Sequence, residues 1–83
     1  MMVRVRFFAS LREAVGLEQE DVKLPPGATI KTLLQTLARA HPGLGALLEG
    51  RGVRFAVNRC YVPPDAGLQE GDEVALVPPV GGG

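Results

Sequence analysis

The C-terminal residues of the sequence have the composition of an arm that could carry a reactive carboxylate. They are two prolines, a valine and three glycines: Pro78, Pro79, Val80, Gly81, Gly82 and Gly83. Prolines lack a backbone N–H, so they end a strand and keep the chain after it from pairing with a sheet. Glycines have no Cβ, so three of them can enter a narrow slot and reach roughly 10 Å further. The pattern therefore predicts a flexible tail over residues 78–83 that presents the α-carboxylate of Gly83 to another protein.

A free α-carboxylate must be activated before it can take part in group transfer. Its ordinary pKa of about 3.3–3.7 makes it anionic and a poor acyl donor at neutral pH. Adenylation with ATP by a partner would supply a leaving group, and a sulfur donor could then displace AMP to form a terminal thiocarboxylate. Delivery of that sulfur into another protein's pocket would position it for transfer. The alternative is a loose chain end without function, which is common in proteins.

Composition excludes several other classes of protein. The 83 residues allow one domain with a modest core, and nine Lys and Arg balance nine Asp and Glu. No basic excess is present to neutralise phosphates, so we expect no nucleic-acid partner and no membrane surface. The sequence lacks a membrane-spanning apolar run and a signal peptide, which predicts a cytoplasmic protein. A single cysteine and a single histidine cannot form a disulfide or a metal site within this chain, so we expect no metal and no stably bound cofactor.

The elements that would hold this tail follow from residue periodicity. Alternation predicts strands from Val3 to about Ala9, from Asp21 to Leu24 and from Val53 to Asn58, with shorter ones at 60–62 and 74–77. A capping-box spacing at Ser10 predicts a short helical turn that ends at Gly16. The main helix begins after Thr29 and ends at His41-Pro42-Gly43. Its apolar stripe comprises Ile30, Leu33, Leu34, Leu37 and Ala38.

The order strand, strand, helix, strand, strand, strand predicts an α+β fold. An N-terminal hairpin and a helix laid across one sheet face leave the last strand free to enter parallel to the first. This arrangement is a β-grasp, a mixed five-stranded sheet packed on one main helix. We expect the domain to span residues 1–77 and the tail residues 78–83.

The sequence resembles the small sulfur-carrier subunit of molybdopterin synthase, a ubiquitin-like β-grasp family, over essentially its whole length. The resemblance lies in four segments: Val5-Arg6-Phe7-Phe8-Ala9 with Leu11-Arg12-Glu13, Ala56-Val57-Asn58, Leu68-Gln69-Glu70-Gly71-Asp72-Glu73-Val74, and Pro78-Pro79-Val80-Gly81-Gly82-Gly83. The last two segments together are the most specific.

The resemblance implies a function for the tail. Gly83 would be adenylated by an E1-like enzyme that uses ATP, converted to a thiocarboxylate and inserted into the large synthase subunit. Two such sulfurs would convert cyclic pyranopterin monophosphate into the dithiolene of molybdopterin. The chain would be a non-catalytic, sulfur-donating subunit of a sulfurtransferase and not an enzyme by itself. No trimming would be needed, because no residue follows Gly83.

Two other functions use the same activated terminus and stay open. The carrier could serve thiamin synthesis or tRNA thiolation, although Pro-Pro-Val before the glycines favours molybdopterin synthase. The chain could instead be a ubiquitin-like modifier whose Gly83 forms isopeptide bonds with lysines.

A partner surface is predicted beside the tail. Phe8 falls on the outer face of the first strand with Arg4 and Arg6. An exposed aromatic side chain there favours a surface for a partner protein, which Ala75 or Val77 of the last strand would complete. Cys60 could relay sulfur, but a lone strand cysteine is more often a small buried side chain, and we expect the latter. His41 is expected to end the main helix and not to act in catalysis.

Overall fold

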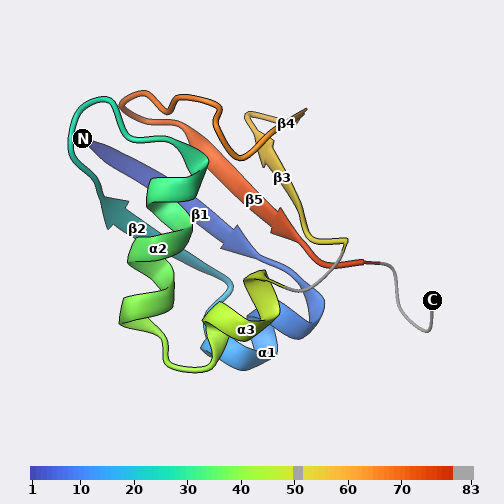
Figure 1. Ribbon diagram of the computed structural model, residues 1–83. Coiled ribbons are helices and arrows are strands. Elements are labelled where there is room, and N and C mark those ends of the chain that lie inside the picture. The colour runs from blue at the N-terminus through green and yellow to red at the C-terminus, as the bar shows by residue number, and fades with distance from the viewer. Residues whose placement is uncertain (50–51, 80–83) are drawn as a thin grey trace.

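The structure, a computed structural model, describes residues 1–49 and 52–79. It contains five strands and three helices in these residues (Figure 1). In chain order they are β1 (Met2–Phe7), α1 (Ala9–Val15), β2 (Gln19–Lys23), α2 (Ile30–Ala40), α3 (Leu44–Leu48), β3 (Arg54–Val57), β4 (Cys60–Val62) and β5 (Glu73–Val77). No helix in the described ranges is both long and apolar enough to span a membrane.

The strands form one mixed sheet in the order β2-β1-β5-β3-β4. β1 pairs with β2 antiparallel and with β5 parallel, whereas β3 pairs antiparallel with both β5 and β4. The three helices lie on one side of this sheet, and α2 crosses it (Figure 1). The predicted β-grasp, with its parallel pairing of the first and last strands, is confirmed.

The core lies between the helices and the inward face of the sheet. Val3, Val5 and Phe7 of β1 are buried, and the three residues between and before them are exposed, as period-two alternation requires. Ile30, Leu33 and Leu37 of α2 belong to the same core, together with buried residues of the other helices and strands. The other two stripe residues of α2, Leu34 and Ala38, are half-buried beside α3.

The main helix begins as predicted at Thr29. The Thr29 side chain accepts a hydrogen bond from the backbone N–H of Thr32, and the Thr32 hydroxyl accepts one from the backbone N–H of Thr29. This reciprocal pair satisfies two backbone donors that a helix start leaves unpaired. The helix ends at His41, whose backbone N–H bonds the carbonyl of Leu37.

The start of α1 differs from the prediction. β1 ends at Phe7 and not at Ala9, and Phe8 is the N-cap residue of α1 without a side-chain cap bond. The predicted capping box at Ser10 is therefore wrong. Ser10 lies inside the first turn because the carbonyl of Phe8 already accepts from the backbone N–H groups of Leu11 and Arg12. The end of α1 at Gly16 is confirmed.

Candidate functional site

The chain leaves the sheet at the end of β5, next to two hollows. β5 ends at Val77, as predicted for a strand followed by proline. Pro78 is half-buried and Pro79 is exposed, and both line a hollow of about 300 Å³ on one side and one of about 200 Å³ on the other. The prolines assigned to the tail thus still contact the domain. The rest of the predicted tail, Val80, Gly81, Gly82 and Gly83, lies outside the described residues.

The sheet face opposite the helices carries a set of side chains beside this exit. Register places Arg6 of β1, Ala75 of β5, Ala56 of β3 and Tyr61 of β4 in one row across four strands. Phe8, Val77 and Arg54 lie one step closer to the tail, since Phe7 pairs with Leu76 and Arg54 with Val77. We call these seven residues the open-face patch: Arg6, Phe8, Arg54, Ala56, Tyr61, Ala75 and Val77.

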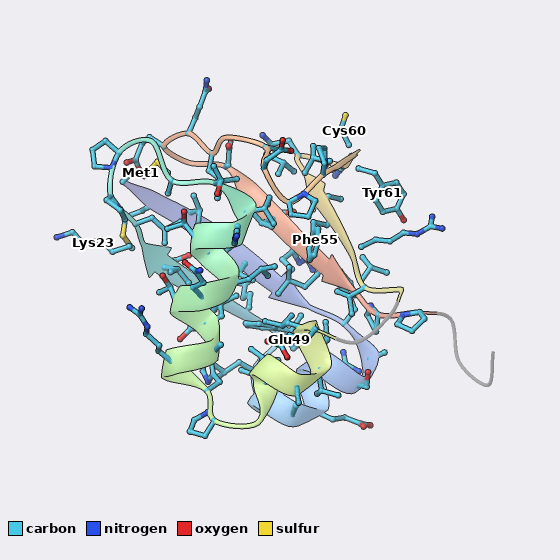
Figure 2. All side chains as sticks on the ribbon, viewed as in Figure 1. Met1, Lys23, Glu49, Phe55, Cys60 and Tyr61 are labelled. Carbon is cyan, nitrogen blue, oxygen red and sulfur yellow. The ribbon has the colours of Figure 1, made fainter. Side chains whose placement is uncertain are left out.

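Each aromatic side chain of the open-face patch carries an arginine over its ring. The Arg6 guanidinium carbon is 5.8 Å from the centre of the Phe8 ring, and that of Arg54 is 5.6 Å from the centre of the Tyr61 ring. Phe8 is 40% exposed and Tyr61 65% exposed. Tyr61 projects away from the sheet in Figure 2. The patch therefore has small apolar residues at its centre and an arginine-covered aromatic on each side.

The charged residues farther along this face pair with one another. Arg4 forms an ion pair with Asp21 at 3.1 Å, and Arg6 lies 3.8 Å from Glu73. All four side chains are about half exposed, so these pairs contribute little to the stability of the fold. Within residues 1–49 and 52–79, Arg54 has no carboxylate within ion-pair distance. This leaves Arg54 able to pair with a carboxylate of another protein.

The three residues predicted for a partner surface are brought together by the sheet. Phe8 and Val77 follow the paired residues Phe7 and Leu76, and Ala75 faces the same side as Val77. Their use as an interface stays a prediction. Sequence reasoning missed Tyr61, Ala56 and Arg54. The signal for them is the two-residue turn Asn58-Arg59, whose residues both have positive φ and which fixes the pairing of β3 with β4.

A second apolar rim lies on the helix side of the exit. The smaller hollow is lined by Leu47 and Ala46 of α3, by Ser10 and Leu11 of α1 and by Val53, together with Pro78 and Pro79. Leu47 is 39% exposed. Apolar side chains thus flank the prolines on both sides, from the sheet face and from α3.

Cys60 and His41 belong neither to the open-face patch nor to the two hollows beside Pro78 and Pro79. Cys60 is exposed at the start of the edge strand β4, so the expectation that it is buried is wrong. The Nε2 atom of His41 lies 2.9 Å from Oε1 of Glu20, and the two mostly covered side chains link the end of α2 to β2. The Phe7 ring meets the His41 ring edge-on at 6.2 Å. His41 therefore has a structural role, as expected.

No group of three or more His, Cys, Asp or Glu side chains among the described residues is arranged to hold a metal ion. The described side chains beside the end of β5 form an apolar and cationic surface.

Comparison with known proteins assigns the family. Residues 5–83 match the ThiS family. The chain belongs to the ThiS family. It is 38% identical to a molybdopterin synthase sulfur carrier subunit of Chlamydomonas reinhardtii, with both chains covered completely. It is 39% identical to that of Escherichia coli, covering 99% of this chain and all of the other.

Other proteins similar to this chain carry a different name. The chain is 36% identical, over the full length of both, to small archaeal modifier protein 3 of Haloferax volcanii. The solved structure of SAMP1 from Haloferax volcanii has a TM-score of 0.92 and 29% identity, with both chains covered completely. The proteins similar to this chain therefore include some named as sulfur carriers and some named as modifiers.

One solved structure contains a similar chain in a complex of two subunits. In the complex of subunits 1 and 2 of the molybdopterin-converting factor from Helicobacter pylori, a chain is similar to this one with a TM-score of 0.70 and 30% identity, both chains covered completely. The resemblance predicted from the sequence and the predicted sulfur-carrier class are confirmed at the level of the family. The thiocarboxylate at Gly83 stays a prediction.

Proposed function

We propose that this ThiS-family chain is the sulfur-carrier subunit of a molybdopterin synthase and that Gly83 carries the sulfur. The observation that supports this most is the position of the open-face patch, which lies next to the point where Pro78 leaves β5. A patch of exposed aromatic and arginine side chains is typical of protein interfaces. A partner that binds this patch would lie beside Pro78 and Pro79, where the tail begins.

The reaction requires two covalent steps at the Gly83 carboxyl group. First, a carboxylate oxygen attacks the α-phosphorus of ATP on an E1-like enzyme, so that an acyl adenylate forms and pyrophosphate leaves. Second, a sulfur donor attacks the acyl carbon and AMP leaves, which yields the thiocarboxylate. The chain binds neither ATP nor another cofactor stably, since the activating partner supplies the nucleotide site.

Sulfur transfer then takes place inside the large synthase subunit. The chain supplies the thiocarboxylate and the docking surface, and the partner supplies the pocket for cyclic pyranopterin monophosphate. Holding the two reactants in one site replaces a bimolecular encounter by a positioned one. The chain is thus a donor subunit and not an enzyme by itself, and the reaction is placed in the cytoplasm.

The test is the intact mass of the chain after incubation with an E1-like enzyme, ATP and sulfide. We expect the mass to increase by the difference between one sulfur and one oxygen. Omission of ATP is the control and should leave the mass unchanged. An unmodified mass in the complete reaction would contradict the proposal.

A ubiquitin-like modifier is the second candidate, favoured by the 36% identity to small archaeal modifier protein 3. Here the Gly83 adenylate passes to a lysine ε-amino group, so an isopeptide bond forms and AMP leaves. Conjugates of higher mass on immunoblots of cells that express the chain, without any thiocarboxylated form, would favour this function over sulfur transfer.

A further inference from the structure

Gly52 lies so close to Pro79, the second residue after β5, that there is no room for a side chain at position 52. Gly52 has a φ of +87°, and a Cβ placed on it would lie 2.9 Å from Cβ of Pro79 and 3.4 Å from its Cγ. A separation of 2.9 Å is shorter than real Cβ contacts allow. The position therefore excludes a side chain for two independent reasons, the left-handed backbone and the proline ring.

Pro79 is exposed but lies beside two parts of the domain. Pro78 and Pro79 line the hollow shared with Arg54 and Tyr61, and also the hollow shared with Leu47 of α3. The proline ring locks φ near −65°, so its place against Gly52 also restricts the direction of the chain that follows. We propose that Gly52 is a positioning residue, a seat for Pro79 that sets where and in which direction the C-terminal residues leave the domain.

The seat matters for the reaction because Gly83 is close to Pro79 in the sequence. Gly83 is the fourth residue after Pro79, and four residues at full extension span at most about 13–14 Å. When the open-face patch is docked on a partner, displacement of Pro79 displaces the Gly83 carboxyl group relative to the partner's reacting atoms. A misplacement of about 1 Å can reduce a reaction rate by roughly a factor of 100. This inference rests on the proposed chemistry of Gly83.

The chain offers a matched control for the substitution Gly52→Ala. Gly27 has a φ of +82° in the turn between β2 and α2, and nothing lies within 4 Å of a Cβ placed on it. Gly27→Ala and Gly52→Ala therefore impose the same kind of backbone strain, but only the second meets Pro79. Any difference between the two variants reports the contact with the proline ring.

The measurement is the steady-state rate of thiocarboxylate formation with an E1-like enzyme, ATP and sulfide. Relative to Gly27→Ala, we expect Gly52→Ala to lower kcat by about tenfold or more, because the carboxyl group is misplaced. The KM for the chain should stay similar, since the open-face patch is unchanged. Equal kcat values for the two variants, or a change confined to KM, would overturn the proposal.

A second variant separates the proline contact from strain at position 52. The atoms of Pro79 that approach Gly52 are Cβ, Cγ and Cδ, and Pro79→Gly removes all three. In the Pro79→Gly background, Gly52→Ala should therefore lower kcat no more than Gly27→Ala does. If Gly52→Ala still lowers kcat by the full amount in the Pro79→Gly background, the contact between Gly52 and Pro79 is not the cause of that loss.

Nuclear Overhauser effects test the seat without sulfur chemistry. We expect cross-peaks between the α-protons of Gly52 and the ring protons of Pro79 in the unmodified chain and in Gly27→Ala. Their absence in the unmodified chain would overturn the seat itself. If the cross-peaks are present but the unmodified chain forms no thiocarboxylate, the seat stands and the proposed function fails.

Discussion

At the scale of single residues, the open-face patch combines two aromatic side chains with two arginines that lie over their rings. Phe8 and Tyr61 are far apart in the sequence but lie on the same face of the sheet, in adjoining rows. A cation–π contact holds one guanidinium over each ring, and both aromatic side chains stay partly exposed. Tyrosine and arginine are the side chains that most often dominate binding energy at interfaces.

Truncation of either aromatic side chain should weaken binding to the large synthase subunit. We expect Tyr61→Ala and Phe8→Ala each to cost about 1–2 kcal/mol of binding free energy, measured by isothermal titration calorimetry. Met2→Ala is the control, because Met2 is 41% exposed on the same face but lies at the opposite end of β1 from Phe8. Equal losses of binding free energy in all three variants would show that the loss depends on the exposure of the side chain and not on its place in the open-face patch.

Asn58 is a second residue whose role is specific. Its Nδ2 donates to the Asp72 carboxylate at 2.9 Å, and its Oδ1 accepts from the backbone N–H of Glu73 at 3.0 Å. These bonds tie the β3–β4 turn to the start of β5, although Asn58 itself has a φ of +49°.

Asn58→Gly keeps the left-handed backbone and removes both side-chain hydrogen bonds. We expect the free energy of unfolding to fall by about 1–2 kcal/mol, measured by urea denaturation. Asp65→Asn, an exposed change in another turn, should have little effect. No loss for Asn58→Gly would show that water replaces these bonds at no cost.

The sequence revealed some of these residues and not others. Phe8 was predicted because a strand's own alternation shows which face a residue is on. Tyr61 was missed because its face depends on the β3–β4 register, which a two-residue turn sets and local alternation in a three-residue strand cannot show. The exposure of Cys60 was missed for a related reason, since only the strand order makes β4 an edge.

At the scale of elements, α2 is the helix that the sequence specifies most completely. Its cap at Thr29, its apolar stripe and its end at His41 were all predicted, because each depends only on residues within the helix or next to it. The start of α1 was predicted wrongly, because the end of β1 is set by pairing with β2 and β5 and not by the residues around Ser10.

Substitutions in the apolar stripe of α2 should reduce stability more at a fully buried leucine than at a half-buried one. Leu33 is fully buried, so Leu33→Ala should reduce the free energy of unfolding by about 2–5 kcal/mol. Leu34 is half-buried beside α3, so Leu34→Ala should cost less than about 2 kcal/mol. Chemical denaturation of both variants makes the comparison, and similar losses would contradict the packing described for α2.

At the scale of the whole molecule, the parallel pairing of β1 with β5 puts the first and the last strand side by side. It brings Phe8, near the start of the chain, level with Val77, directly before the prolines. The helices cover the other side of the sheet, so the open-face patch and the end of β5 lie where no helix covers the sheet (Figure 1). The β-grasp therefore brings the open-face patch next to the point where the chain leaves β5.

Removal of Gly81–Gly83 should separate stability from function. Among residues 1–49 and 52–79, every buried residue lies between Val3 and Leu76, so we expect the thermal unfolding midpoint to be unchanged. Thiocarboxylate formation should be lost, as followed by intact mass. Asp65→Asn, an exposed change in the turn after β4, is the control and should retain the reaction. A clear drop in the unfolding midpoint on truncation would show that these residues stabilise the domain.

The most direct test of the central claim is a single-turnover transfer of sulfur. The chain, thiocarboxylated at Gly83, is mixed with the large synthase subunit and cyclic pyranopterin monophosphate, without ATP or sulfide. We predict that the dithiolene product forms while the mass of the chain returns to that of the free carboxylate, with two chains consumed for each product. A thiocarboxylate that persists beside unchanged substrate, or a chain that becomes joined to a lysine of its partner, would contradict the account.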